Sequence, residues 1–454
     1  MQEKNISFNN FEQCIKCTIC TAYCPVVAVN PLYPGPKQAG PDGERLRLKN
    51  KYFFDENLKY CMNCKRCEVA CPSGVKIADL IHSARRRFST ATPGLRDRLL
   101  ASTDFMGKMA RPFAPVVNFM VASKPVKAVM DATLHIDSHR TFPKYKAHGF
   151  ESWFRKEAQD AQKAYSKQIA FFHGCSTEFQ QPEVGKAFVT VMNAVGYGVQ
   201  LMDEKCCGVA MISNGMWNGA TKHAKHNVAE FEKVVAAGLP IVATSSTCVF
   251  TMRDEYPDVL SVDNSSVRDS ITLVEKFLFE LVDSGKVKLV FKDDYRARIA
   301  YHIPCHVEKL GWSIFTKALM NMIPGVSFTV LDSGCCGIAG TYGFKKENYK
   351  YSQEIGRPVF EQIKAVAPDF VCSECETCKW QIEMSTDYKV KNPILILAEA
   401  LELEATAMAN SKKKKKRRDR KPVSVFESAI YLRNLPPGIG RAALICQYIW
   451  SCRP

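Results

Sequence analysis

The chain has 454 residues, 46% of them hydrophobic, which is enough for two or three domains with cores of their own. Its formal net charge is +16, but residues 411–454 hold 12 Lys and Arg against 2 Asp and Glu and so account for +10 of it. This basic segment could bind nucleic acid, but no recognition fold accompanies it, so we expect no nucleic-acid partner. No uninterrupted apolar stretch approaches the roughly 18 residues that cross a bilayer.

Twenty cysteines are the most informative part of the composition. They fall into ligand spacings, and the opening residues MQEKNISFNNFEQ have no apolar core of the kind that a signal peptide needs. We therefore expect a protein of a reducing cytoplasm with metal–sulfur sites, rather than a secreted protein with disulfides.

The first 90 residues contain the run Cys-x2-Cys-x2-Cys-x3-Cys-Pro twice. In two-cluster ferredoxins the fourth cysteine of each run serves the other cluster. The first [4Fe–4S] cluster is therefore expected on Cys14, Cys17, Cys20 and Cys71. The second is expected on Cys61, Cys64, Cys67 and Cys24. Zinc is the alternative, but zinc sites usually combine two Cys-x2-Cys pairs.

Between the two runs, the segment from Pro31 to Gly43 holds so many prolines and glycines that we expect no regular structure there. The spacing of apolar residues predicts a helix over Ile77–Phe88. Residues 91–165 form a helical connector, broken at Pro112, Pro115, Pro125 and Pro143. Its apolar residues between 116 and 130 lie beside Lys124 and Lys127, a pattern that fits packing between domains or docking at a membrane interface.

Residues 166–402 contain an internal repeat. Cys175 recurs as Cys305, Cys206-Cys207-Gly208 as Cys335-Cys336-Gly337, and Cys248 as Cys378, always 129 or 130 positions later. Short β-branched or aromatic strands alternate with helical stretches in both halves. The predicted strands are Gln168–Phe172, Gly198–Met202, Ile241–Thr244, Arg298–Tyr301 and Ser327–Leu331, and the clearest helices are Val184–Val195 and Trp312–Met322. This alternation predicts two parallel α/β units, 166–290 and 291–402, with the cysteines at the carboxyl ends of the strands.

The second repeat offers five thiols, more than a zinc ion or one cubane requires, and this number suggests an unusual iron–sulfur cluster. They are Cys305, Cys335, Cys336, Cys375 and Cys378. The first repeat offers Cys175, Cys206, Cys207 and Cys248, which fit either a further cluster or a redox thiol pair. Ser245 stands there in place of Cys375, and its hydroxyl is a poorer iron ligand than a thiolate. The second repeat is therefore expected to hold the stronger site.

Four other residues near these cysteines are weaker candidates for a functional role. Cys372 breaks the repeat, since its counterpart is Val242, and we expect it to be a buried strand residue. His173, His302 and His306 are either structural residues or proton donors to a reduced acceptor. No residue is assigned a catalytic role.

The segment 403–454 is basic, and we expect it to be a solvated, disordered tail. Its run from Lys412 to Lys421 fits anionic lipid, but it also fits a reading-frame slip at the five-lysine tract. Cys446 and Cys452 therefore receive no role. The fold expected for the whole chain is α+β and α/β: a helical ferredoxin-type domain over 1–90, the connector over 91–165, and two tandem parallel α/β cysteine-rich repeats.

A two-cluster ferredoxin domain ahead of two Cys-Cys-Gly repeats resembles the iron–sulfur subunits of heterodisulfide reductases and glycolate oxidases. Three longer stretches resemble the C subunits of anaerobic glycerol-3-phosphate dehydrogenases. They are GPKQAGPDGER at 35–45, KRCEVACP at 65–72 and CETCKWQI at 375–382. The resemblance covers about residues 8–402.

The resemblance implies a function in electron transfer. Flavoprotein subunits of the A and B type would oxidise glycerol 3-phosphate, and this chain would pass their electrons to menaquinone from the cytoplasmic face of the inner membrane, as a peripheral protein. It also implies noncubane clusters in the Cys-Cys-Gly repeats. The residues themselves show no nucleotide-phosphate fingerprint, so we expect no flavin on this chain.

Three alternatives remain open. The chain could serve a complex that oxidises glycolate or lactate. It could be a catalytic disulfide reductase of the heterodisulfide reductase type. It could also be a structural anchor whose repeats bind little metal.

Overall fold

The computed structural model describes residues 8–89, 92–332 and 334–411. Residues 1–410 form one unit, and residues 411–454 are a separate one. The expectations for the basic tail beyond Ser411, including Cys446 and Cys452, lie outside the described residues.

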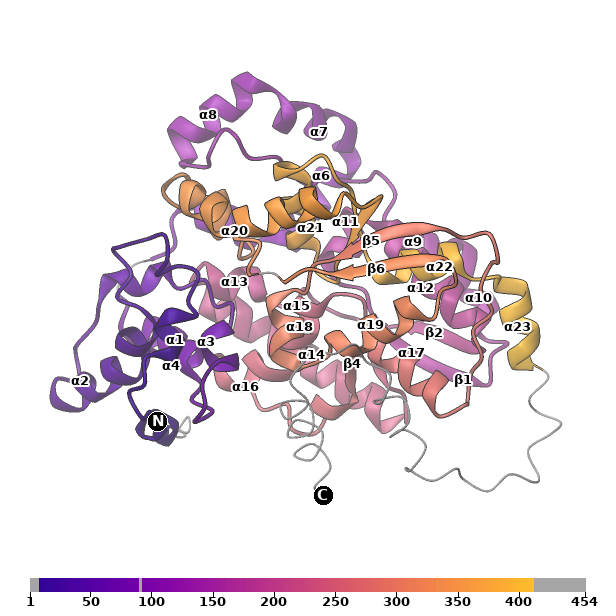
Figure 1. Ribbon diagram of the computed structural model, residues 1–454, viewed down its shortest axis with the longest axis horizontal. Coiled ribbons are helices and arrows are strands. Elements are labelled where there is room, and N and C mark those ends of the chain that lie inside the picture. Colours follow the sequence, from indigo (N-terminus) through magenta and orange to yellow (C-terminus); the bar gives the residue numbers. More distant parts are fainter. Residues whose placement is uncertain (1–7, 90–91, 333, 412–454) are drawn as a thin grey trace. The chain divides into compact units, whose positions relative to one another are not determined.

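The cluster domain is built from short helices around the two cysteine runs (Figure 1). Its helices are α1 (Ile19–Ala22), α2 (Gly43–Lys49), α3 (Arg66–Val69) and α4 (Ile77–Phe88), with 3-10 turns at Phe8–Gln13 and Glu56–Tyr60. Helix α4 has the bounds that the sequence predicted. It buries Ile77, Leu80, Ile81 and Ala84, which lie on one helical face, against the cysteine-bearing loops.

The segment from Pro31 to Gly43 is not irregular throughout, so that prediction was wrong in part. Gln38–Asp42 form a π-helical turn that leads directly into α2. The wider turn accommodates Pro41, which has no amide hydrogen to donate. Gly40 packs against α4 so closely that a Cβ there would lie 2.9 Å from Ile77 Cγ2. Long-range packing on α4 thus orders a segment whose composition is typical of a loop.

The connector is helical, as predicted, and three of its four prolines lie at helix beginnings. Its helices are α5 (Leu95–Ala101), α6 (Thr103–Ala110), α7 (Ala114–Ala122), α8 (Lys124–Leu134), α9 (Phe150–Trp153) and α10 (Gln159–Gln162), with a 3-10 turn at Arg111–Phe113 and a π-helical turn at Phe154–Ala158. Pro115 and Pro125 occupy the first turns of α7 and α8, where a missing amide costs nothing. These two helices form a hairpin at the top of Figure 1.

The first repeat is a four-stranded parallel sheet with helices between its strands. Its elements are β1 (Lys167–Phe172), α11 (Gly174–Phe179), α12 (Pro182–Ala194), β2 (Tyr197–Leu201), α13 (Val209–Ser213), α14 (Trp217–Ala236), β3 (Ile241–Ala243), α15 (Ser246–Phe250), a π-helical turn at Thr251–Glu255, α16 (Tyr256–Asp258), a 3-10 turn at Arg268–Ser270, β4 (Ile271–Leu273) and α17 (Val274–Asp283). The strand order is β2-β1-β3-β4. In the register, Ala170 of β1 pairs with Gln200 on one side and Ile241 on the other.

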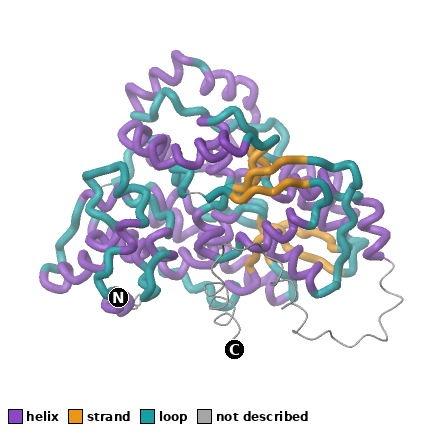
Figure 2. Tube along the Cα trace, viewed as in Figure 1, coloured by secondary structure: helices purple, strands orange, loops and turns teal. Residues whose placement is uncertain are grey.

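The second repeat has the same architecture. Its elements are β5 (Ala297–Tyr301), α18 (Cys305–Leu310), α19 (Ser313–Asn321), β6 (Val326–Val330), a 3-10 turn at Tyr342–Phe344, α20 (Lys346–Val366), β7 (Phe370–Cys372), α21 (Glu376–Ser385), β8 (Val390–Lys391) and α22 (Pro393–Ala400). The order β6-β5-β7-β8 reproduces that of the first sheet, and all its pairs are parallel. Figure 2 draws the strands in orange among the surrounding helices. Cys372 lies at the end of β7 and is completely buried, as predicted.

The two repeats share one hydrophobic core. Helix α12 of the first repeat packs on α22 of the second, and α17 of the first packs on α19 of the second. Phe171, Phe188, Tyr301 and Leu397 are among the residues that this core buries completely. Because each repeat covers part of the other, the carboxyl ends of both sheets are held next to each other.

Residues 403–411 form helix α23 (Leu403–Ser411), so the expectation of disorder was wrong for this part of the segment. The Thr406 hydroxyl accepts a hydrogen bond from the Val290 amide at 3.1 Å, and the Asn410 side chain donates to the Lys288 carbonyl at 2.9 Å. Among the described helices, none combines the length and the apolar character that a membrane span requires.

Candidate functional site

The cysteines of the first predicted cluster lie together in the cluster domain. Burial raises the pKa of the Cys20 thiol, and the sulfurs of Cys14, Cys71 and Cys17 add to this effect. Cys71 accepts a hydrogen bond from the Val75 amide at 3.4 Å. Cys17 is solvent-exposed, whereas Cys20 is buried, so this group reaches the protein surface at Cys17.

The cysteines of the second predicted cluster surround a small cavity of about 20 Å³. Its lining includes all four of them: Cys24, Cys61, Cys64 and Cys67. Burial raises the pKa of Cys24 to about 11, with a further contribution from Cys61. Cys24 and Cys67 are buried, and Cys61 and Cys64 are half-buried. Four thiols this close together are unfavourable as anions unless a metal cation offsets their charge. The cavity and its lining therefore fit a metal–sulfur group.

Both cysteine runs have the same backbone conformation. The residues on either side of the middle cysteine are left-handed in each run: Lys16 and Thr18 beside Cys17, and Asn63 and Lys65 beside Cys64. Alternating handedness turns successive amides toward one point, which is the arrangement that anionic sulfur centres favour. The repeated sequence run is thus a repeated backbone cradle.

The second repeat gathers its five cysteines from three strand ends. Cys305 opens α18 after β5, Cys335 and Cys336 follow β6, and Cys375 and Cys378 follow β7. The Cys336 and Cys378 sulfurs are 3.3 Å apart, and the Gly337 amide donates to Cys335 Sγ at 3.3 Å. The hydrogen bond from Cys378 lowers the pKa of Cys375 to about 5, and the one from Cys305 lowers that of Cys335.

Gly337 is required by the close packing behind the cysteine pair. Its φ is +90°, and a Cβ there would lie 2.0 Å from the Ser352 carbonyl oxygen. Gly208, its counterpart in the first repeat, has a φ of +89°, but a Cβ there would meet nothing closer than 3.5 Å. Both positions need a left-handed residue, and Gly337 also has no space for a side chain.

In the first repeat four cysteines converge in the corresponding way. Cys175 lies in α11, Cys206 and Cys207 follow β2, and Cys248 lies in α15. The Cys206 and Cys175 sulfurs are 3.8 Å apart, and Thr103 Oγ1 donates to Cys206 Sγ at 3.3 Å. The hydrogen bond from Cys175 lowers the pKa of Cys206. One of the four thiols thus has a lowered pKa, compared with two of the five in the second repeat.

Ser245 is bound to the other repeat. Its hydroxyl donates to the Glu376 carboxylate at 2.9 Å and accepts a bond from the Cys248 amide at 3.3 Å, which caps α15. Next to it, the Ser246 amide donates to the Glu374 carbonyl at 3.1 Å. The position that provides a thiol in the second repeat is therefore, in the first, part of the contact between the repeats.

The thiols of both repeats line one cavity of about 140 Å³. Cys64 of the cluster domain reaches the same cavity. Apolar side chains form much of the remaining wall, among them Phe179, Val209, Ile338 and Trp380. An apolar cavity with a few reactive groups is the usual form of a small-molecule site. Its position at the carboxyl ends of β1, β3, β5 and β7 is where the sequence placed the repeated cysteines.

The cluster domain meets this cavity on the side of the second repeat. Burial raises the pKa of Cys64, and the neighbouring sulfur of Cys335 adds to this effect. The hydrogen bond to Cys335 raises the pKa of Cys305, and burial and then Cys64 add to it. Between the domains, Arg66 Nη1 is 2.9 Å from Glu308 Oε2. Burial opposes the charge of Arg66, but Glu308 and then the sulfurs of Cys305 and Cys335 raise its pKa.

The three histidines differ in environment. His302 is completely buried, burial lowers its pKa to about 4, and it lies close to the sulfurs of Cys336 and Cys378. His306 lines the shared cavity and stacks on Phe250, and burial lowers its pKa. Although burial opposes it, Glu204 raises the pKa of His173, 3.0 Å away. Proton donation by any of the three stays a prediction.

Sequence reasoning missed the polar residues that surround the cysteines of the repeats. Asp104 of α6 accepts a hydrogen bond from the Cys206 amide at 3.0 Å. Glu374 is buried and accepts from the Tyr301 hydroxyl at 2.6 Å, and burial raises the pKa of Glu376 to about 7. The two glutamates flank Cys375 and could have been noticed there. Thr103 and Asp104, more than 100 residues from Cys206, gave no signal.

Comparison with known families agrees with this division of the chain. Residues 10–75 match the 4Fe-4S dicluster domain, and residues 169–253 and 299–383 each match the cysteine-rich domain. These matches indicate iron–sulfur clusters, and the two cysteine-rich matches coincide with the two sheets.

Three relatives illustrate the range of similar proteins. The chain is 55% identical over 395 residues to the C subunit of the anaerobic glycerol-3-phosphate dehydrogenase of Escherichia coli K12, an alignment that covers 86% of this chain and 99% of that protein. It is 24% identical to the B subunit of the fumarate reductase (CoM/CoB) of Methanothermobacter marburgensis, over 85% of this chain and 71% of that one. It is 22% identical to the D subunit of the dihydromethanophenazine:CoB–CoM heterodisulfide reductase of Methanosarcina barkeri, over 88% of this chain and 96% of that one.

Proposed function

The chain belongs to the family of iron–sulfur C subunits of anaerobic glycerol-3-phosphate dehydrogenases, and we propose that it carries electrons from flavoprotein subunits to menaquinone. The donor reaction would be the oxidation of glycerol 3-phosphate to dihydroxyacetone phosphate, which releases two electrons and two protons. Menaquinone would take up two electrons and two protons in the cavity between the repeats.

The observation that carries this proposal is the unbroken succession of thiol groups. It begins at the exposed Cys17, continues from Cys20 to Cys24, and reaches Cys64 beside Cys335. It ends at an apolar cavity that can enclose a small molecule. Iron–sulfur clusters bound by these cysteines would supply one-electron transfer.

The chain's own residues define the ends of this path. At the surface, Ile15, Lys16, Thr18 and Ile19 surround Cys17 and are exposed, which leaves this edge free for an electron donor. At the cavity, Phe179 and Trp380 provide an apolar wall for a lipophilic acceptor. Arg66 places a positive charge between Cys64 and the second repeat, where it stabilises negative charge on the neighbouring sulfurs.

The ligand sets proposed are those read from the sequence. Cys14, Cys17, Cys20 and Cys71 would hold one [4Fe–4S] cluster, and Cys61, Cys64, Cys67 and Cys24 the other. The five cysteines of the second repeat would hold a noncubane cluster, and the four of the first repeat a further one. The partners would be flavoprotein subunits and the menaquinone pool at the cytoplasmic face of the inner membrane.

The test is an anaerobic assay of the chain with its flavoprotein partners. With glycerol 3-phosphate as donor, the complex should reduce menadione, a naphthoquinone without a side chain. Cys336→Ala should lower this activity about 100-fold while the flavoprotein still reduces a dye. Iron and sulfide should exceed the roughly eight irons of two cubanes. Menadione reduction that is unchanged in Cys336→Ala would refute the proposed exit and favour a structural anchor.

The same cavity gives a disulfide reductase a structural basis, because thiols of both repeats face it. The isolated chain, reduced chemically, would then cleave a disulfide at a rate that depends on Cys336. Glycolate or lactate as the better donor would instead assign the chain to a different flavoprotein. The 55% identity to an iron–sulfur subunit from a glycerol-3-phosphate dehydrogenase favours the first proposal over both.

A further inference from the structure

The hairpin of α7 and α8, together with α6, leaves its large apolar side chains uncovered. Phe119 is 77% exposed, Phe113 64% and Val129 60%. Phe105, Met109, Val116 and Met120 are exposed as well. Helix α8 has no buried residue, and α7 buries Ala114 alone. The sequence left open whether this apolar stretch packs between domains, and the structure shows that most of it does not.

Polar contacts at its base hold the hairpin in place. The Asn118 side chain donates to the Tyr145 carbonyl at 2.8 Å and accepts from the Tyr145 amide at 2.9 Å. Asp131 of α8 pairs with Lys346 and accepts from the Ser138 amide at 3.0 Å. The hairpin is therefore fixed without burying its apolar face, which remains free to bind something else.

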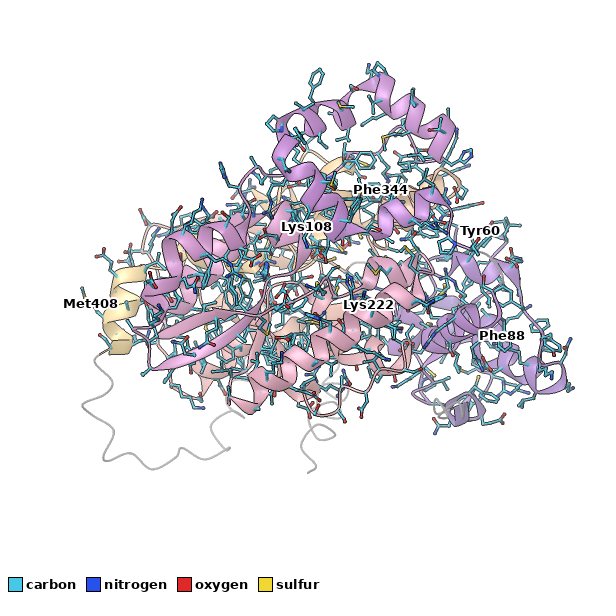
Figure 3. The ribbon with its side chains drawn as sticks, turned by 180° about the vertical axis from the view of Figure 1, so that it is seen from behind. Tyr60, Phe88, Lys108, Lys222, Phe344 and Met408 are labelled. Atoms are coloured by element: carbon cyan, nitrogen blue, oxygen red, sulfur yellow. The ribbon has the colours of Figure 1, made fainter. Side chains whose placement is uncertain are left out.

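The charge around this apolar face is basic. Lys108, Lys124 and Lys127 accompany it, and Lys144 and Lys146 follow on the next loop. Lys108 lies on α6, below the hairpin whose side chains point outward in Figure 3. Within residues 105–134 the one acidic residue is Asp131, which Lys346 already pairs. Apolar side chains flanked by lysines match a bilayer that contains anionic lipid.

The same helices reach the shared cavity. Thr103 at the beginning of α6 lines it, two residues before the exposed Phe105. Gly107 of α6 lies against Phe179, another lining residue, so closely that a Cβ there would be 2.4 Å from the ring. One helix therefore connects the exposed apolar face with the apolar wall of the cavity.

We infer that α6, α7 and α8 seat this chain on the surface of a bilayer containing anionic lipid, with the apolar face in the lipid and the cavity next to it. The inference rests on the proposed function in one respect, since a lipid-dissolved acceptor needs a short route to the cavity. The hairpin is the membrane-binding surface, and the lipid-dissolved acceptor enters the cavity through the wall formed by α6 and Phe179.

Vesicle flotation of the full chain tests this directly. The vesicles contain phosphatidylethanolamine with about one-third phosphatidylglycerol, and purely phosphatidylcholine vesicles are the comparison. Val116→Ser with Phe119→Ser should lower binding at least about tenfold, because two large apolar groups no longer enter the lipid. Leu48→Ser with Tyr52→Ser replaces two exposed apolar residues of the cluster domain and should leave binding unchanged.

A second variant, which changes charge instead of apolar surface, tests the inference even if the apolar variant does not fold. Lys124→Glu with Lys127→Glu should weaken binding to the anionic vesicles about tenfold or more and have little effect on neutral ones. Lys49→Glu with Lys51→Glu, also exposed, is its control. Iron content and circular dichroism should be the same in all variants.

The basic tail is the competing membrane contact. Replacing Lys412–Lys416 by glutamine should leave most of the binding in place. Binding lost in this variant and retained in Val116→Ser with Phe119→Ser would overturn the inference. The inference would also be overturned if the wild-type chain did not bind vesicles and used the hairpin to form a dimer or to bind its flavoprotein partner.

A second readout separates this inference from the proposed function. Wild type and both hairpin variants should reduce menadione in solution at the same rate. Wild type should reduce menaquinone in vesicles far faster than either hairpin variant. Absence of menadione reduction in the wild type would refute the proposed function and leave the flotation result standing. Equal menaquinone reduction in vesicles by wild type and both hairpin variants would refute the membrane seat alone.

Discussion

The two repeats have the same strand order and the same cysteine positions, but they present different chemistry to the cavity they share. The second provides five thiols, two of them with a lowered pKa, and it lies against Cys64 of the cluster domain. The first provides four thiols, one with a lowered pKa, and uses Ser245 to bind its neighbour. A duplicated fold has thus kept its framework in both copies, while Cys64 of the cluster domain lies next to the thiols of one of them.

The largest effect should come from exchanging the residue that distinguishes the repeats. Cys375→Ser gives the second repeat the hydroxyl that the first one has, which is a poorer ligand for iron. We expect its iron to be lost and menadione reduction to fall about 100-fold, at the upper end of what altered metal sites cost. Iron analysis and the anaerobic assay measure both.

The matched control is Ser245→Cys in the first repeat. It removes the bond to Glu376, so unfolding should become easier by about 1 kcal/mol, with menadione reduction close to wild type. If Ser245→Cys damaged activity as much as Cys375→Ser, the repeats would contribute equally to the path and the comparison would fail.

The glycines after the cysteine pairs should also respond unequally. Gly337→Ala forces a Cβ onto the Ser352 carbonyl in addition to the cost of a left-handed alanine, so we expect a loss of about 2–5 kcal/mol. Gly208→Ala has room for the methyl group and should cost about 1–2 kcal/mol. Anaerobic urea unfolding of both variants measures the difference. Equal losses would show that the second repeat is not the more tightly packed one.

Removing the charge between the cluster domain and the second repeat should change redox potentials. Arg66→Gln takes a positive charge away from the sulfurs of Cys64, Cys305 and Cys335, so reduction becomes less favourable there. We expect a midpoint potential lower by about 30–60 mV, or roughly a factor of 3 to 10 for one electron, in an EPR-monitored titration. Arg86→Gln is the control, since Arg86 binds the Val259 carbonyl of the first repeat instead. Equal shifts in both variants would argue against the placement of Arg66.

The smallest effect concerns the contact of the cluster domain with the first repeat. His82 of α4 meets Trp217 edge to face at 6.4 Å, and burial lowers its pKa well below the ordinary 6.5. The unfolded chain therefore binds a proton more readily, so stability is lost as the pH falls below about 6.5. The loss is at most about 1.4 kcal/mol per pH unit for this one group.

His82→Phe keeps the packing and removes the titration. Its unfolding free energy should change less between pH 6.5 and pH 5.5 than that of the wild type. The same slope in both proteins would mean that His82 is protonated in the folded chain, which would require a looser contact with the first repeat.

Local patterns explain how much of this could be predicted from the sequence. The strands from Gln168 and Arg298 were found within a residue of β1 and β5, because buried parallel strands are continuous apolar runs. β4 and β8, which have three and two residues, were missed. The exposed face of Phe119 could not be predicted either, because an apolar helix has the same pattern whether a domain or a lipid covers it.

The candidate site divides in the same way. Local cysteine spacing, together with the internal repeat that singled out Cys175 and Cys305, identified every thiol that lines the two cavities. The contacts between domains were invisible, because Arg66 and Glu308 or Ser245 and Glu376 meet only after both sheets have formed. That the cysteines of both repeats line one cavity is therefore visible only in the tertiary structure.

The most direct test compares equivalent cysteines of the two repeats in one assay. Cys336→Ala and Cys207→Ala are made in the full chain, and the rate of menaquinol formation is measured anaerobically with the flavoprotein partners and glycerol 3-phosphate. The account predicts a loss of about 100-fold for Cys336→Ala and of no more than about tenfold for Cys207→Ala. A larger loss for Cys207→Ala, or no loss for Cys336→Ala, would contradict the claim that electrons leave through the second repeat.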